Sequence, residues 1–273
     1  MIDLHCHFLP GVDDGAADAD EALALARASL AQGIGVAVLT PHLHPGRYSA
    51  GRGRLRAVFE DYVRLLAAHG VGLELRLACE MRVCAETVAL LRAGQVSFVG
   101  RVGSARVLLV EFPHDRLPPG SLELMRHLVS QGIRPLIAHP ERNRAVMRQP
   151  ELIRPFVDAG CWLQLTAASV TGEFGAAAQA TARYLVEEDL AWVLATDAHN
   201  MKHRPPCLAE GRAVLAEWVG DAIARRMVSD RPAQILGLVR KGTDLAAGHA
   251  RVAGSEPPLR AAPMRLQAVR AHG

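Results

Sequence analysis

Two histidines one residue apart follow the first apolar run of the chain. Residues 2–5 predict a short strand that ends in His5, and His7 stands two positions further on. Because side chains alternate between the two faces of a strand, both imidazoles point the same way and can hold one metal ion. Such a pair also arises by chance, so its meaning depends on ligand-type residues at equivalent places along the chain.

The same pattern recurs at the ends of later apolar runs. Six of seven predicted strands are followed by His, Asp or Glu: His5 and His7, His42 and His44, Glu80, Glu111, His139, and Asp197 with His199. Asp13 and Asp14 follow the first strand and reach the same rim. Alone, each residue could cap a helix, pair with an arginine or sit in a loop. Together they favour metal ligation, because charged groups crowded at one edge are costly unless they are paired or bound to cations.

The ligand types narrow the choice of metal and of chemistry. His, Asp and Glu without a thiolate suit Mn²⁺, Fe²⁺ or Zn²⁺, and there are enough ligands for more than one ion. Cys6, between the two histidines, is expected to face the opposite side of its strand. Adjacent divalent ions bridged by hydroxide hydrolyse phosphate esters, so this constellation is typical of a metal-dependent phosphatase.

The elements that must position these side chains alternate between apolar runs and amphipathic stretches. We predict strands at residues 2–5, 36–40, 73–78, 106–111, 134–138, 161–165 and 191–196. Helical patterns occupy residues 18–32, 52–69, 85–92, 120–131, 150–159, 174–187 and 208–218, followed by 221–229 and 231–238. Gly33, Gly70, Gly132 and Gly160 follow four of these helices, where left-handed caps form.

This alternation indicates βαβ units and a parallel α/β fold. Seven such units without a glycine-rich dinucleotide motif favour a closed or nearly closed barrel, and 273 residues, half of them apolar, suit its size. In a parallel barrel the C-terminal ends of all strands lie on one face. The ligand-type residues are therefore expected to converge although they are spread over much of the sequence.

Charge and hydropathy exclude two broad classes of function. The net charge of +3 arises at the C-terminal end, where residues 238–273 hold six of the 31 basic and two of the 28 acidic residues. Residues 1–237 thus lack the positive charge that nucleic acid binding needs. No uncharged apolar stretch is long enough for a membrane span, and no signal peptide is recognisable. Residues 239–273, rich in Gly, Ala, Pro and Arg, are expected to be a disordered basic tail, with a short helix possible at 264–271.

The cysteines bear on compartment and mechanism. Five of them, at positions 6, 79, 84, 161 and 207, form no Cys-x-x-Cys pair. An odd, scattered set favours the reducing cytoplasm over a disulfide framework. No cysteine is followed by arginine at the spacing Cys-x5-Arg, so the phosphate loop of cysteine-dependent phosphatases is absent from the sequence.

Taken in order, these motifs resemble the polymerase-and-histidinol-phosphatase (PHP) superfamily. The resemblance rests on His5-Cys-His7, the run 9–15 (LPGVDDG), Thr40-Pro-His42, Glu80, Glu111, the run 138–142 (AHPER) and the run 196–199 (TDAH). The opening HxHxxPGxDDG and the run from His199 to Arg204-Pro-Pro are similar to bacterial manganese-dependent protein-tyrosine phosphatases of capsular and exopolysaccharide operons. The match covers about residues 1–238, the expected PHP domain, and implies a distorted (β/α)7 barrel.

The resemblance also implies a site for three metal ions, Mn²⁺ before Fe²⁺ or Zn²⁺. The three implied ligand sets are His5, His7, Glu80 and Asp197; Glu80, Glu111 and His139; and Asp14, His42 and His199. Arg142 and Arg204 would hold phosphate oxygens. One departure is Thr166, where similar proteins are expected to have Asn, and it bears on a supporting hydrogen bond rather than on a metal.

The implied substrate is phosphotyrosine on a bacterial tyrosine autokinase that controls polysaccharide synthesis. A hydroxide that bridges two metals would attack phosphorus directly, and His44 is a candidate acid for the leaving group. Two alternatives stay open: a PHP-type phosphatase of small molecules such as histidinol phosphate, and a metal-binding module without catalysis. The sequence leaves the oligomeric state open.

Overall fold

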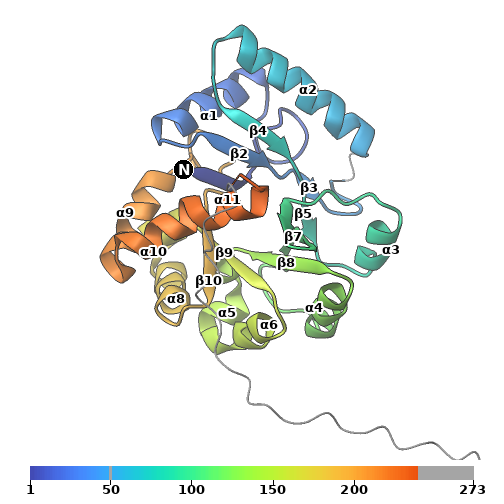
Figure 1. Ribbon diagram of the computed structural model, residues 1–273, viewed down its shortest axis with the longest axis vertical. Helices are drawn as coiled ribbons and strands as arrows, with labels where there is room; N and C mark the ends of the chain where they lie inside the picture. The colour runs from blue at the N-terminus through green and yellow to red at the C-terminus, as the bar shows by residue number, and fades with distance from the viewer. Residues whose placement is uncertain (49–50, 239–273) are drawn as a thin grey trace, which may run out of the picture. The chain divides into compact units, whose positions relative to one another are not determined.

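Strands and helices alternate along the chain, with most of the helices around the outside of the strands (Figure 1). The computed structural model describes residues 1–48 and 51–238. The strands are β1 (Ile2–Cys6), β2 (Val36–Leu39), β3 (His42–Leu43), β4 (Glu74–Leu77), β5 (Glu80–Arg82), β6 (Gly100–Val102), β7 (Ala105–Glu111), β8 (Ile133–Ala138), β9 (Trp162–Thr166) and β10 (Ala191–Ala195).

The helices vary widely in length. They are α1 (Ala19–Ala31), α2 (Arg52–Ala68), α3 (Thr87–Arg92), α4 (Ser121–Ser130), α5 (Arg144–Arg148), α6 (Arg154–Asp158), α7 (Ala167–Thr171), α8 (Ala176–Glu187), α9 (Leu208–Val219), α10 (Asp221–Arg225) and α11 (Arg231–Leu236). Short 3₁₀ turns η1 (Pro140–Arg142) and η2 (Pro150–Ile153) and a π-helical turn η3 (Arg226–Asp230) join them. None of the helices in the described ranges is long and apolar enough to cross a bilayer.

The strands form two sheets that share two interrupted strands. One sheet has the order β1-β2-β4 and the other the order β10-β9-β8-β7-β5-β3, with the short β6 antiparallel to β7 and all other pairs parallel. The chain leaves β2 and enters β3 after only residues 40–41, and it leaves β4 and enters β5 after residues 78–79. Each of these two strands therefore begins in one sheet and ends in the other.

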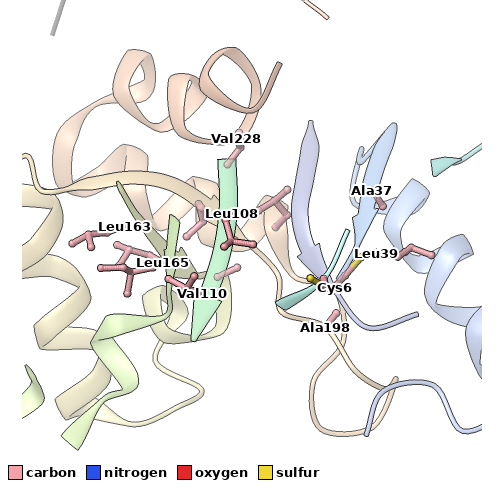
Figure 2. Packing of buried hydrophobic residues seen from close by; sticks show 14 of the residues in the cluster. Cys6, Ala37, Leu39, Leu108, Val110, Leu163, Leu165, Ala198 and Val228 are labelled. Carbon is pink, nitrogen blue, oxygen red and sulfur yellow. The ribbon is translucent and has the colours of Figure 1, made fainter. Parts of the chain in front are cut away.

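The first and last strands of this series also meet. The His7 amide donates to Ala198 O at 2.9 Å, and the Asp197 amide donates to His5 O at 2.8 Å. Figure 2 shows Cys6 beside Leu39 and Ala198 at this junction, where β1 lies between β2 and the segment after β10. If β2 with β3 and β4 with β5 each count as one strand, and the antiparallel β6 is left out, the described part of the chain has seven parallel strands. The predicted α/β fold with a distorted barrel is confirmed, with two sheets in place of one continuous ring.

Alternation along the strands divides the core into two clusters. Val107 and Leu109 of β7 belong to a cluster that also includes side chains from β1, β2, β8 and β10. Leu108 and Val110 point the other way and pack with apolar residues of the helices (Figure 2). Side chains on successive positions of a strand face opposite sides, so one cluster fills the interior and the other joins strands to helices.

Helix α11 contributes to the interior cluster. Its Ile235 and Leu236 are buried among side chains of the strands. The close approach depends on Gly100 in β6, because a Cβ there would stand 2.1 Å from Ile235 O. The core residues of this cluster and the ligand-type residues are different side chains of the same strands, so the cluster supports the strands that carry the site.

Most predicted elements are found close to their expected bounds. Gly33, Gly70, Gly132 and Gly160 have φ of 74°, 65°, 71° and 99°, which confirms their left-handed caps. The single helix predicted at 150–159 is instead η2 followed by α6, and β3, β5, β6, α5 and α7 were not predicted. Pro155 explains the split, because a proline lacks the amide that would continue the preceding turn. The tail predicted at 239–273 lies outside the described residues.

Candidate active site

The ligand-type residues meet at the C-terminal ends of the strands. Most of them lie near the end of β1, β7, β8 or β10 or just after it, and the loop after β1 adds Asp14. His42 and Glu80 begin β3 and β5, the short segments that continue β2 and β4. A pocket with about 250 Å³ of open space lies over them. It is lined by Asp14, His42, Glu111, His114, His139, Arg142, Asp197, His199 and Arg204. The structure therefore brings all nine predicted ligand residues to one place.

Four ligand atoms surround one point beneath the pocket. His5 Nε2 and His7 Nε2 lie 3.1 Å apart. Glu80 Oε2 lies 3.3 Å from the first of these nitrogens and 3.4 Å from the second. Asp197 Oδ1 lies 3.3 Å and 3.5 Å from the same two atoms. Two imidazoles and two carboxylates at this spacing form a ligand set that one divalent ion could occupy.

Two further groups adjoin the first. Glu80 Oε1 lies 3.1 Å from His139 Nε2, and Glu111 Oε1 lies 3.9 Å from the same nitrogen. On the other side, Asp14 Oδ1 lies 3.2 Å from His42 Nε2 and 3.7 Å from His199 Nε2.

The grouping by distance differs in detail from the implied ligand sets. Within 4.8 Å of one another lie His7, Asp14, His42 and His199; His5, His7 and Glu80; His5, His139 and Asp197; and His42, Glu80 and Glu111. His7 thus belongs to two groups. Glu111 is grouped with His42 and Glu80, although its Oε1 also lies 3.9 Å from His139 Nε2. The groups share members, so ions held there would be close neighbours.

Hydrogen bonds behind the histidines decide which ring nitrogen faces the centre. His5 Nδ1 lies 2.8 Å from Gln164 Oε1, and His7 Nδ1 lies 2.8 Å from Asp13 Oδ2. His199 Nδ1 lies 2.9 Å from the backbone oxygen of Asp197. Because each of these partners accepts, Nδ1 of the neutral ring would carry the proton, which leaves the Nε2 lone pair to face a cation in the site.

The loop after β1 is built around the Asp13-Asp14-Gly15 sequence. Asp13 accepts from the backbone amides of Gly15 at 3.0 Å and His42 at 2.9 Å, in addition to its bond with His7. A Cβ on Gly15 would stand 2.0 Å from the His7 backbone oxygen, so only glycine lets the loop fold this closely. In this motif Asp13 supports neighbouring residues, Asp14 is a candidate ligand, and Gly15 allows the close approach of the backbone.

The electrostatics of the cluster call for positive charge at its centre. Burial alone would raise the pKa of Glu80, but His5 and His42 hold that pKa well below its usual value. Burial likewise lowers the pKa of His42, yet Glu80 and Asp14 raise it to about 10. The carboxylates thus draw protons onto neighbouring imidazoles.

Two buried atoms at this centre lack a hydrogen bond. Within the described residues, Glu80 Oε2 and His199 Nε2 have no partner with hydrogen-bond geometry. Buried polar atoms without partners are costly, and a bound cation would satisfy both. The donor types, their inward lone pairs and these two atoms together fit divalent metal ions.

Two arginines approach the same cluster from the pocket. Arg142 Nη1 donates to Asp197 Oδ2 at 2.5 Å, and Arg204 Nη2 donates to the same oxygen. Arg142 is the last residue of η1. This turn directly follows His139, whose φ of 34° turns the chain at the end of β8. Asn200 Oδ1 accepts from the Arg204 amide and its neighbours and holds the second loop. Asp197, with φ of 52°, makes the corresponding turn after β10.

Sequence reasoning missed several residues that support this site. Asp3 is buried and accepts from Thr196, which ties β1 to β10, and burial raises its pKa to about 6. Arg82 donates to Glu111 Oε2 at 2.8 Å, and His114 lies at the pocket edge, 3.7 Å from Glu111 Oε1. The sequence holds one sign of Asp3 and Arg82. Each lies two residues from a candidate ligand, His5 or Glu80, and therefore on the same face of its strand.

Two predicted features stand apart from the pocket. His44 is not among the residues that line it; its backbone pairs with Tyr48, whose ring stacks on His42 at 5.4 Å. Its role as an acid stays a prediction. The Thr166 amide donates to Glu141 Oε1 at 2.9 Å, and Thr166 belongs to none of the ligand groups.

Comparison with known proteins agrees with the geometry. Residues 1–237 match the family described as capsular polysaccharide synthesis, CpsB/CapC. The chain belongs to the CpsB/CapC family. The predicted resemblance to proteins of capsular polysaccharide synthesis is thereby confirmed.

The relatives of this CpsB/CapC chain carry related names. It is 34% identical to the tyrosine-protein phosphatase YwqE of Bacillus subtilis over 82% of its own length and 87% of that protein. It is 27% identical to the tyrosine-protein phosphatase CpsB of Streptococcus pneumoniae, over 86% and 98% of the two chains.

Solved structures agree. One chain from the crystal structures of YwqE and CpsB, described as metal-dependent tyrosine phosphatases, superposes with a TM-score of 0.80 at 32% identity, over 86% of this chain and 94% of that one. An organophosphorus hydrolase variant from Deinococcus radiodurans shares the fold, with a TM-score of 0.52 at 18% identity over 85% and 92%.

Proposed function

We propose that this chain is a metal-dependent tyrosine-protein phosphatase that hydrolyses phosphotyrosine to tyrosine and inorganic phosphate. The observation that carries the proposal is the meeting of nine ligand-type side chains with two arginines at one end of the strands. Imidazoles and carboxylates bind divalent cations, and guanidinium groups bind phosphate oxygens. The family match and the names of the relatives support the same activity.

The site that we propose holds three divalent ions, most readily Mn²⁺. Its ligands are His5, His7, Glu80 and Asp197 for the first ion, Glu80, Glu111 and His139 for the second, and Asp14, His42 and His199 for the third. When bound, such ions supply an activated water at neutral pH and offset the charge of the phosphate. Gln164 and Asp13 orient the histidines that face these ions.

Arg142 and Arg204 would bind the phosphate oxygens of the substrate. Both guanidinium groups reach one carboxylate oxygen of Asp197. One anionic oxygen therefore fits between them, and a phosphate oxygen is likewise an anionic acceptor of such bonds. Charge-assisted bonds from two directions would hold the phosphate over the ligand cluster and neutralise charge that develops on its oxygens.

Water rather than a side chain is the proposed acceptor of the phosphoryl group. Among the described residues that line the pocket, none is Ser, Thr or Cys. Cys6 lies between two candidate ligands, but its Sγ faces Val38 O at 3.5 Å on the other side of β1. Burial also raises the pKa of the Cys6 thiol well above its usual value, so no thiolate is available there.

The protein substrate that we propose is a bacterial tyrosine autokinase of capsule or exopolysaccharide synthesis. The match to a family of capsular polysaccharide synthesis supports this choice. We also propose that the chain acts in the cytoplasm. All five cysteines lie in the described ranges and are unpaired, as in proteins of reducing compartments.

The test compares three substrates with Mn²⁺-loaded protein: a phosphotyrosine peptide, the matching phosphoserine peptide and histidinol phosphate. We expect the phosphotyrosine peptide to have the highest kcat/KM, and a chelator or His42→Ala to abolish its hydrolysis. His69→Ala, at the exposed end of α2, is the matched control and should retain full activity.

Two outcomes contradict the proposal. Preference for histidinol phosphate would favour a small-molecule phosphatase. Metal binding without hydrolysis of any of the three substrates would favour a module that binds metal but does not catalyse.

A further inference from the structure

One phenylalanine contacts both arginines that line the pocket. The centre of the Phe174 ring lies 4.3 Å from Arg142 Cζ and 6.0 Å from Arg204 Cζ. A guanidinium within about 6 Å of an aromatic ring is attracted by the ring's quadrupole. One ring thus contacts two cations that come from separate loops.

The turn that carries Phe174 has a well-defined conformation. It joins α7 to α8, and Gly172 and Gly175 adopt φ of 93° and 91°, which side chains rarely allow. The Gly175 amide donates to Gly172 O at 2.8 Å, and the Phe174 amide donates to Ala168 O at 3.4 Å. The side chain of Gln179 packs behind Gly172. A Cβ on Gly172 would stand 3.2 Å from the side-chain amide nitrogen of Gln179. Phe174 is therefore held in place independently of the arginines.

The arginines need such support. Their side chains are 18% and 22% exposed, so burial alone does not fix them. An arginine loses considerable rotamer freedom when it binds a phosphate, and ordering it beforehand improves affinity. We infer that Phe174 is a positioning residue that holds Arg142 and Arg204 ready for the phosphate. This inference rests on the proposed function, in which these two arginines bind the substrate.

The experiment measures binding of inorganic phosphate to the Mn²⁺-loaded full chain by calorimetry. Phe174→Leu removes the ring but keeps apolar bulk, and we expect phosphate to bind about 5- to 10-fold more weakly. Phe174→Tyr keeps an aromatic face and should restore binding to within about twofold. For p-nitrophenyl phosphate, KM should rise with Phe174→Leu while kcat changes little.

A matched control uses a second pair of the same kind. Arg106 Cζ lies 4.2 Å from the Phe98 ring, outside the pocket. Phe98→Leu should leave phosphate affinity unchanged, and bound Mn²⁺ per chain should be the same in all variants.

Three results overturn the inference: unchanged phosphate affinity in Phe174→Leu, an equal loss in Phe174→Tyr, or loss of bound metal in Phe174→Leu. Phosphate binding does not require turnover. A chain that weakens phosphate binding on substitution but cleaves no phosphotyrosine would refute only the proposed function.

Discussion

Asp13 supports two histidines of the proposed metal site without belonging to any ligand group. One carboxylate oxygen lies 2.8 Å from His7 Nδ1 and accepts from the His42 amide at 2.9 Å, and the other accepts from Gly15 at 3.0 Å. Burial alone would raise its pKa, but His7 holds the pKa of Asp13 at about 2, so the carboxylate is charged at neutral pH. Asp13→Ala removes all three bonds.

The size of the expected effect follows from these contacts. Loss of the residue behind one ligating histidine typically weakens metal binding by 10- to 100-fold, or about 1.4 to 2.7 kcal/mol. Because Asp13 supports His7 and also positions His42, we expect Asp13→Ala to reach the upper end for at least one ion. Asp13→Asn keeps the shape but loses the charge, and about a tenfold loss is expected.

The assay is Mn²⁺ bound per chain after dialysis, together with the Mn²⁺ concentration that gives half-maximal phosphatase activity. High Mn²⁺ should restore much of the activity of Asp13→Ala, because the ligands themselves are intact. Asp158→Ala, at the exposed end of α6, is the control and should behave like the parent chain. A half-activating concentration within twofold of the parent for Asp13→Ala would refute the supporting role.

Three further predictions follow from other contacts. Gly15→Ala puts a Cβ 2.0 Å from a backbone oxygen and should lower Mn²⁺ affinity at least tenfold, whereas Gly35→Ala, with nothing within 4 Å, should not. Arg231→Met removes hydrogen bonds from a buried guanidinium to two backbone oxygens. The free energy of unfolding, measured in urea, should fall by about 1–3 kcal/mol. The control Arg56→Met, at an exposed position, should lower it by about 0.5 kcal/mol or less. The pKa of His42 is about 10 without metal, so Mn²⁺ must displace a proton from this side chain. Mn²⁺ binding should therefore tighten as pH rises from 6 to 8, and calorimetry should detect released protons. Mn²⁺ affinity that does not change with pH would contradict this prediction.

The meeting of the candidate ligands could be predicted because all of them except Asp14, which lies in a loop, stand at or near the end of an apolar run. Parallel topology puts all strand ends on one face, so no knowledge of side-chain packing was needed to bring His5 and Asp197 together. The supporting residues were harder, since their roles depend on pairs distant in sequence. Gln164 contacts His5 across 159 residues, and Asp3 contacts Thr196 across 193.

The interruptions of the second and third strands were also beyond sequence reasoning. β3 has two residues and follows β2 after Pro41, and β5 has three and follows β4 almost at once. Such short segments carry no periodicity. Only pairing defines them as strands, β3 with β5 and β5 with both β3 and β7. Phe174 gave no signal either, because its contacts with two arginines depend on loops from three parts of the chain.

The most direct test of metal-dependent hydrolysis is a titration of metal-depleted protein with Mn²⁺, following phosphate released from a phosphotyrosine peptide. We expect no turnover without metal, and activity that rises until about three ions are bound per chain. Full turnover in the metal-depleted protein, or turnover that survives His42→Ala at saturating Mn²⁺, would contradict it.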